Sequence, residues 1–133
     1  MPITPGLSHT AAVTVDEHNI ASALGSGLVD VFATPMMVAL LEQAASECIR
    51  PCLEAGQASV GTHLDVSHTA ATPVGLKVFA TATVREVDRR RVVFDISVRD
   101  EVEEIGRGTH TRFIIELERF MQKAAQKSAQ PEQ

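Results

Sequence analysis

Three side chains of different chemistry lie on or beside apolar segments of the chain: the hydroxyl of Thr34, the carboxylate of Glu42 and the imidazole of His68. Thr34 precedes a proline at the start of an apolar stretch, and Glu42 lies two helical turns further along it. His68 ends an alternating pattern that is typical of a strand. A hydroxyl, a carboxylate and an imidazole suit acyl transfer, which uses a nucleophile or polariser, a base and a charge stabiliser.

The apolar stretch predicts one long helix, from about residue 35 to 54 and closed by Gly56. On a helical wheel, Glu42 falls inside the apolar sector and near its edge. A buried carboxylate is costly unless it is paired, hydrogen-bonded or protonated. One interpretation is that Glu42 reaches solvent past the sector edge or pairs with a core arginine. The other is an acid or base whose proton affinity burial increases.

After this helix the apolar period changes to two, which indicates a strand. Strict alternation places Val60, Leu64 and His68 on the inward face, and Gly61 on the wetter face with His63. An inward histidine at a strand end is more often a satisfied core residue than a catalyst, so both interpretations of His68 stay open. We interpret the other histidines as ordinary surface or packing residues: His9, His18, His63 and His110.

Thr34 fits the N-cap position of the predicted helix, with Pro35 in its first turn. That structural role alone would explain the residue. A helix N-terminus also offers free N–H groups and the positive end of the helix dipole, which suit an oxyanion or a polarised carbonyl. The two roles are compatible. Gly61, which has no side chain, would let a substrate approach the backbone closely.

The order of predicted elements is a short edge strand near Ala11 to Val15, a loop or short helix, the long helix, and four antiparallel strands joined by short turns. The apolar sector of the helix is too wide for an ordinary surface helix. We therefore predict an α+β hotdog fold, in which an antiparallel sheet curls around one long central helix. One domain is expected over residues 1–120, followed by a polar tail over 121–133.

The composition limits the class of partner. The formal net charge is −5 and Trp and Tyr are absent, which argues against nucleic acid. Apolar runs are too short to span a membrane, and the N-terminus lacks the apolar core of a signal peptide. We therefore expect a cytoplasmic protein that binds neither nucleic acid nor a membrane.

Three motifs carry a resemblance to a known family: VFATPMMVALLEQA, then VGTHLDVSHTAATPVG, then the strand IGRGTHTRFII. From Val31 to Phe120 the chain resembles the fluoroacetyl-CoA thioesterase family of hotdog proteins. The resemblance implies hydrolysis of an acyl-CoA thioester by a homodimer, without metal or cofactor. It also implies that Thr34, Glu42 and His68 are catalytic, that Gly61 helps to bind the acyl end, and that Arg112 lies near the active site.

The chain departs from the family in the segment before Val31. In the fluoroacetyl-specific enzyme this segment forms a lid whose phenylalanines select the substrate. Here it is shorter and has no Phe before Phe32, and Leu28 stands where a gating Phe would be expected. Leu28 and Phe32 are therefore substrate-binding candidates, and we expect a different short or medium acyl group.

Two other functions compete with hydrolysis. A hotdog enoyl-CoA hydratase or dehydratase would usually show an Asp-x-Asn-Pro-x-His element in the early helix region, and no such string occurs. A non-catalytic acyl-CoA-binding module would use the same pocket without turnover. The complete Thr34, Glu42 and His68 set argues against that module.

Overall fold

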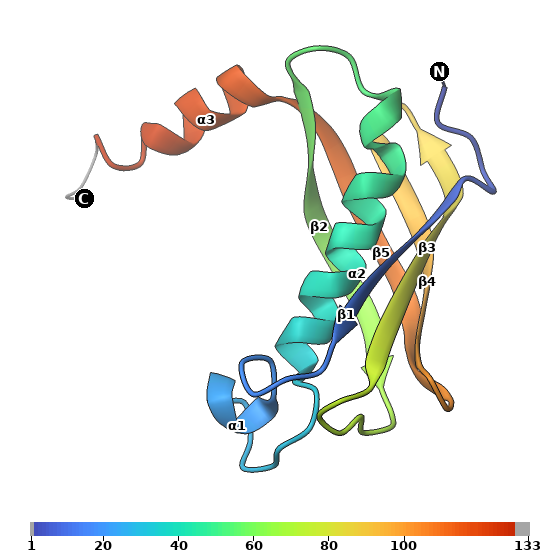
Figure 1. Ribbon diagram of the computed structural model, residues 1–133. Helices are drawn as coiled ribbons and strands as arrows, with labels where there is room; N and C mark the ends of the chain where they lie inside the picture. The colour runs from blue at the N-terminus through green and yellow to red at the C-terminus, as the bar shows by residue number, and fades with distance from the viewer. Residues whose placement is uncertain (1, 130–133) are drawn as a thin grey trace.

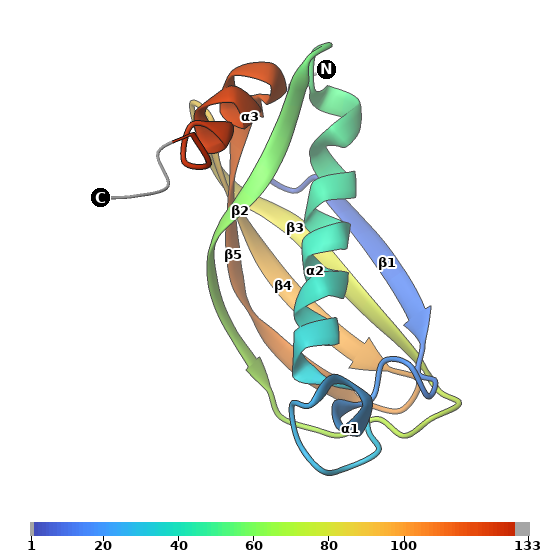
Figure 2. The ribbon, with the colours of Figure 1, turned by 90° about the vertical axis from the view of Figure 1, so that its left-hand side faces the viewer.

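The computed structural model, which describes residues 2–129, has one five-stranded antiparallel sheet with helix α2 packed along its concave face (Figures 1 and 2). The strand order is β1-β3-β4-β5-β2, so β1 and β2 form the two edges. The strands are β1 (Ser8–Thr14), β2 (Gln57–His68), β3 (Lys77–Asp88), β4 (Arg91–Asp100) and β5 (Glu104–Glu116). The helices are α1 (Ala21–Leu24), α2 (Thr34–Ile49), η1 (Arg50–Cys52, a 3-10 turn) and α3 (Leu117–Ala125). The predicted hotdog fold is confirmed.

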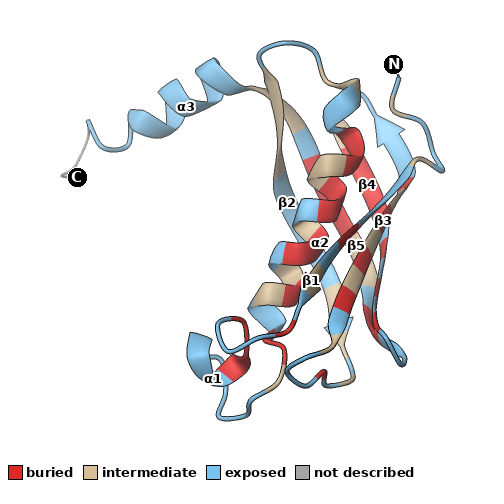
Figure 3. Cartoon of the chain, viewed as in Figure 1, coloured by how far each residue is buried: buried red, intermediate tan, exposed pale blue. Residues whose placement is uncertain are grey.

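The core lies between α2 and the central strands. One face of α2 is buried, and alternate residues of β3 and β4 face it (Figure 3). The α2 residues in this core are Met37, Leu40, Leu41, Ala44, Ala45, Cys48 and Ile49. The opposite face of α2 stays exposed or half-buried, and Glu42 lies on the border between the two faces.

The long helix is shorter than predicted. It ends at Ile49 rather than near residue 54, and one 3-10 turn follows, Arg50–Cys52. Pro51 explains the difference, because proline has no N–H to continue the helical hydrogen bonds. The thirteen-residue strand β5 stops at Glu116, four residues before the predicted end of the domain at residue 120.

The C-terminal segment differs from the predicted polar tail. Helix α3 runs from Leu117 to Ala125, across the predicted boundary at residue 120, and projects away from the sheet (Figure 1). None of its residues is buried, and Leu117, Phe120 and Met121 are exposed. The last part of the predicted tail, 130–133, lies outside the described residues.

A β-bulge corrects the predicted faces of β2. Gly61 pairs with Arg112 and His63 pairs with Thr111, so the register skips Thr62. The extra residue reverses the alternation, which places Gly61 on the inward face, against Glu42. The prediction that Gly61 shares the wetter face with His63 is therefore wrong. His68 lies inward as predicted.

The loop that leads into α2 is fixed to the sheet through two buried residues. Thr72 donates its hydroxyl to Asp100 at 2.8 Å, and its carbonyl accepts the N–H of Phe32 at 2.9 Å. Asp100 is only 2% exposed. Because Phe32 lies two residues before Thr34, these hydrogen bonds anchor the backbone that leads into α2.

Replacing Asp100 with asparagine is expected to lower the free energy of unfolding near neutral pH by about 1–3 kcal/mol. Burial alone would raise the pKa of Asp100, but hydrogen bonds from the Glu103 and Val102 N–H groups and from Thr72, together with the charge of Arg99, lower it below 3.8. A lowered carboxyl pKa contributes stability above the unfolded pKa, and this stability is lost as pH falls through the folded pKa.

Urea unfolding across the acidic range measures this contribution. The Asp100→Asn variant should lose stability less steeply on acidification than the wild type. Asp88→Asn, at an exposed position on β3, is the matched control and should follow the wild-type curve. An unchanged acid dependence in Asp100→Asn would contradict the assignment.

Candidate active site

Thr34 and His68 form the first half of the candidate site. Thr34 is the first residue of α2, and the extended residue before it, Ala33 (φ −76°, ψ 139°), occupies the N-cap position. The predicted N-cap role of Thr34 is therefore wrong by one residue. Its hydroxyl lies 2.7 Å from Nδ1 of His68 instead. The helix start thus presents this hydroxyl to an imidazole.

The imidazole of His68 is held toward its neutral form. Burial lowers the pKa of His68, and the backbone of Ala70 opposes this shift only in part. Its Nε2 is buried and forms no hydrogen bond within residues 2–129. A neutral imidazole can accept a proton, so Nδ1 can act as a base toward the Thr34 hydroxyl or toward a bound water.

A pocket of about 320 Å³ opens beside this pair. Its wall comes from α1, from the segment between α1 and α2, and from the loop after β2. The residues that line it are Ala21, Ser26, Gly27, Val29, Val31, Phe32, Thr34, His68, Thr69, Ala70 and Ala71. Phe32 is 1% exposed and forms part of the wall, whereas Leu28 is 98% exposed and does not line the pocket.

Glu42, Gly61 and Arg112 form the second half. Glu42 Oε2 lies 3.6 Å from Nη1 of Arg112, and the Glu42 side chain is 39% exposed. Both parts of the structural interpretation hold, since Glu42 reaches solvent and pairs with an arginine. A Cβ on Gly61 would lie 2.6 Å from Glu42 Oε2. Only glycine therefore leaves this carboxylate in place.

Arg112 is buried and fully engaged. Its Nε donates to the Ser59 hydroxyl at 2.9 Å and its Nη2 donates to the Ser59 carbonyl at 3.0 Å. Its Nη1 lies 3.2 Å from Nε2 of His110, which is completely buried. Burial lowers the pKa of Arg112, and the charge of Glu42 opposes the shift.

The sequence interpretation of His110 as an ordinary packing residue missed this contact. Alternation could have found it, because His110 and Arg112 are two residues apart on one strand and so share a face.

The two halves are separated along α2. Eight residues of helix place Thr34 and Glu42 about 12 Å apart along the helix axis. One chain therefore brings Thr34 to His68, and Glu42 to Gly61 and Arg112, but it does not join the two groups directly.

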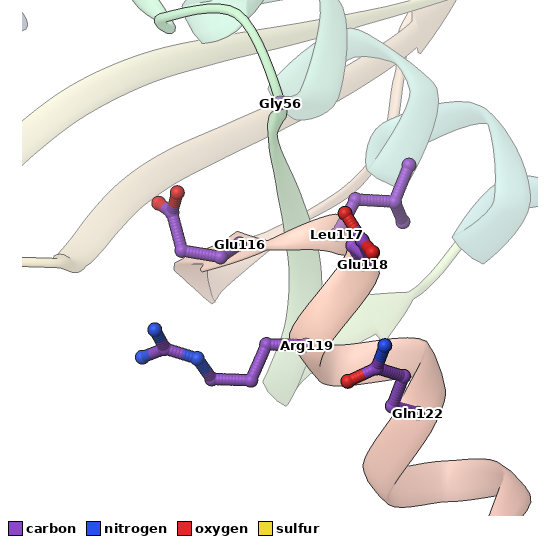
Figure 4. A pocket seen from close by; sticks show the side chains of 6 residues that line it. All are labelled: Gly56, Glu116, Leu117, Glu118, Arg119 and Gln122. Carbon is purple, nitrogen blue, oxygen red and sulfur yellow. The ribbon is translucent and has the colours of Figure 1, made fainter.

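A second hollow lies near the opposite end of α2, between the start of β2 and helix α3 (Figure 4). It measures about 530 Å³, and its wall combines charged and polar side chains with apolar surface; the lining residues are Gly56, Glu116, Leu117, Glu118, Arg119 and Gln122. None of the predicted site residues lines it. Within residues 2–129 there is no cluster of metal-ligating side chains and no helix long and apolar enough to cross a membrane.

The chain is similar to known proteins in both sequence and fold. The sequence profile of the fluoroacetyl-CoA-specific thioesterase family matches residues 15–118. A fluoroacetyl-CoA thioesterase of Streptantibioticus cattleyicolor is 50% identical over 99 residues, which span 74% of this chain and 71% of that protein.

Two solved structures of the fluoroacetyl-CoA thioesterase FlK are similar to the whole domain. One superposes with a TM-score of 0.91 at 41% identity, covering 96% of this chain and 98% of that chain. The other, a threonine-to-serine mutant in complex with acetyl-CoA, has a TM-score of 0.90 at 40% identity and covers 94% and 98% of the two chains. On the sequence match, the identity and the shared fold together, the chain belongs to the fluoroacetyl-CoA-specific thioesterase family.

Proposed function

We propose that this thioester hydrolase cleaves short or medium acyl-CoA into CoA and the free acid, with Thr34, His68 and Glu42 as its catalytic residues. The observation that carries the proposal is the 2.7 Å contact between Thr34 Oγ1 and His68 Nδ1, which opens onto a pocket at the start of α2. The relatives named above act on, or bind, acyl-CoA, which supports the substrate class.

The thioester carbonyl is expected to lie at the N-terminus of α2. Pro35 has no N–H, and the N–H groups of Met36 and Met37 both bond to the carbonyl of Ala33. Within the described part of the chain, the N–H of Thr34 has no acceptor and is the backbone donor left for the oxyanion. Thr34 therefore contributes both a hydroxyl and an N–H at this point.

Two routes to the products use this arrangement. In the covalent route, Thr34 Oγ1 attacks the carbonyl carbon while His68 Nδ1 accepts its proton; the C–S bond then breaks, the proton passes to the CoA thiolate, and water hydrolyses the acyl-enzyme. In the direct route, Glu42 or His68 removes a proton from water, which attacks the same carbon while Thr34 polarises the carbonyl; the C–S bond then breaks and the proton passes to the CoA thiolate. A pre-steady-state burst of CoA release distinguishes the first route from the second.

The active unit is a homodimer in this proposal, with Glu42 of one chain completing the Thr34–His68 pair of the other. Two features support it. Strand β2 pairs only with β5 among the described residues, and a free twelve-residue edge favours pairing with a second copy. The partly exposed Glu42 lies about 12 Å along the helix from Thr34 in its own chain.

The expected cytoplasmic location stays a prediction.

The size of the pocket supports a short or medium acyl group in this proposal. Its volume of about 320 Å³ is at the lower end of the usual range for small-molecule sites, roughly 300–1,000 Å³, which favours a short or medium acyl chain. Leu28, an exposed side chain in the segment beside the pocket, replaces the aromatic residue expected there. We therefore expect no strict selection for fluoroacetyl-CoA.

A thiol-release assay with fluoroacetyl-, acetyl-, butyryl-, hexanoyl- and aryl-acyl-CoA tests the function and the acyl preference together. Butyryl- or hexanoyl-CoA should give a higher kcat/KM than fluoroacetyl-CoA. A clear preference for fluoroacetyl-CoA would overturn the predicted specificity. Thermal stabilisation by these ligands without CoA release would instead identify an acyl-CoA-binding module.

A further inference from the structure

His110 is a completely buried histidine whose two nitrogens both have a partner. Nδ1 lies 2.8 Å from the backbone carbonyl of His63, and Nε2 lies 3.2 Å from Nη1 of Arg112. The ring stacks near Phe94, with centroids 6.3 Å apart and an interplanar angle of 26°. Its position and rotation are therefore fixed by three neighbours on three strands.

These contacts determine the protonation state of His110. A carbonyl oxygen can only accept, so Nδ1 must carry the hydrogen. Arginine can only donate, so Nε2 must offer a lone pair to Arg112. Both conditions hold only for the neutral Nδ1–H tautomer. A protonated imidazole would instead point a second donor and a like charge at the guanidinium.

Among the charged groups around the ring, Arg112 favours the neutral form and Glu42 opposes it. Arg112 lies beside the ring on β5, Glu42 approaches from α2, and His63 lies next to it on β2. Burial lowers the pKa of His110, the backbone of His63 opposes this, Arg112 lowers the pKa further, and Glu42 raises it. The neutral form required by the hydrogen bonds is therefore also the form that burial favours.

Arg112 has little freedom once these bonds are made. Ser59 accepts from Nε and Nη2, and His110 accepts from Nη1. Nη1 also lies 3.6 Å from Oε2 of Glu42. The guanidinium is held from two sides and presents its charge to one carboxylate.

We propose that His110 is a positioning residue for the reaction: by accepting a hydrogen bond from Arg112 it fixes the guanidinium, and through it the carboxylate of Glu42. This inference rests on the proposed function, because it assigns His110 to the orientation of the proposed catalytic carboxylate. His110 itself touches neither the pocket beside Thr34 nor any reacting atom.

Two substitutions separate the acceptor role from simple packing. His110→Gln places a side-chain oxygen near the position of Nε2 and keeps an acceptor for Arg112. His110→Asn places its amide nitrogen near Nδ1 and keeps the donor to His63, but it leaves Arg112 without an acceptor. Both replace an aromatic ring by a smaller amide, so both should lower Tm.

The two variants are expected to differ in kcat. His110→Asn should reduce kcat about 10- to 100-fold, by analogy with the loss when the hydrogen-bond partner that orients a metal ligand is removed, and His110→Gln should stay within about threefold of wild type. KM should change little in either. In a Glu42→Gln background, His110→Asn should cause little further loss, because its effect passes through that carboxylate.

A second readout does not depend on turnover. Long-range ¹H–¹⁵N correlation spectra of the wild-type protein should show the His110 ring as the neutral Nδ1–H tautomer at about neutral pH. Arg112→Gln should alter the Nε2 signal of that ring. An Nε2–H tautomer, or a charged ring, would overturn the proposal directly.

The outcomes are separable. A wild-type protein without activity on any acyl-CoA would refute the proposed function, while the tautomer measurement would still test the hydrogen-bond arrangement. An active wild type with equal kcat in the Asn and Gln variants would refute the positioning role alone. Additive losses in the Glu42→Gln background would refute the route through Glu42.

Discussion

Replacing His68 with alanine is expected to lower kcat for acyl-CoA hydrolysis by about 10²–10⁴-fold, the usual contribution of a general base. The reason is that His68 Nδ1 lies 2.7 Å from the Thr34 hydroxyl. Among the described residues, His68 is the base in hydrogen-bond contact with that hydroxyl. KM should change less than kcat, because the pocket wall formed by Phe32 and its neighbours stays in place. Steady-state CoA release measures both constants.

The pH profile of the wild type follows from the same residue. Burial lowers the pKa of His68 below 6.5, and a base must be unprotonated to act. Activity should therefore persist below about pH 6.5 and fall as pH drops through the lowered pKa. A loss of activity that already begins above about pH 6.5 on acidification would contradict the role of a buried, neutral imidazole.

The Thr34→Val substitution tests the other side of the Thr34–His68 contact. It removes the hydroxyl that His68 contacts, so the two substitutions should be strongly non-additive when combined. His18→Gln, at a side chain that is 82% exposed, is the matched histidine control and should keep wild-type kcat. Near-wild-type rates in His68→Ala would remove His68 from the mechanism.

The sequence predicted the architecture well because its signals are local. The change of apolar period after the long helix identified where helix gives way to strands, and turn residues separated the strands. Element ends were less predictable. Pro51 ends α2 early, and the amphipathic segment beginning at Leu117 forms a helix that crosses the predicted boundary between domain and polar tail.

The sequence identified candidate site residues but not how the fold groups them. Thr34 and His68 meet because the start of α2 lies beside the end of β2, and such a contact between distant segments has no local signature. The bulge at Thr62 reverses the faces of β2, which is why simple alternation placed Gly61 on the wrong side. In the bulged strand, Gly61 and Arg112 lie beside Glu42 and form a second group, apart from Thr34 and His68.

Glu42→Gln is the second prediction with a large expected effect. The substitution keeps the size of the side chain and its place beside Gly61, but removes the charge that pairs with Arg112 and the oxygen that can act as base or nucleophile. We expect a loss in kcat of about 10²–10⁴-fold. Glu47→Gln is the control on the same helix, since Glu47 pairs with His9 on β1 and lies away from Arg112.

The Glu42→Gln variant also tests whether the site is shared between chains. Thr34 and Glu42 are about 12 Å apart along α2, so the Glu42 that serves a given Thr34–His68 pair is expected to come from the partner chain. Glu42→Gln and His68→Ala dimers, each nearly inactive, would then complement each other. A hybrid dimer places both substitutions in one of its sites and leaves the other site intact.

After unfolding and refolding an equal mixture, about half of the dimers should be hybrids with one intact site each, so about a quarter of wild-type activity should return. A site contained within one chain predicts no recovery, because every chain in the mixture carries a defect. Recovery should also depend on dimer exchange, so mixing the folded variants for a short time should restore less activity than refolding them together. Absence of recovery in a mixture shown to contain hybrid dimers would place Glu42 in the same-chain site and refute the shared arrangement.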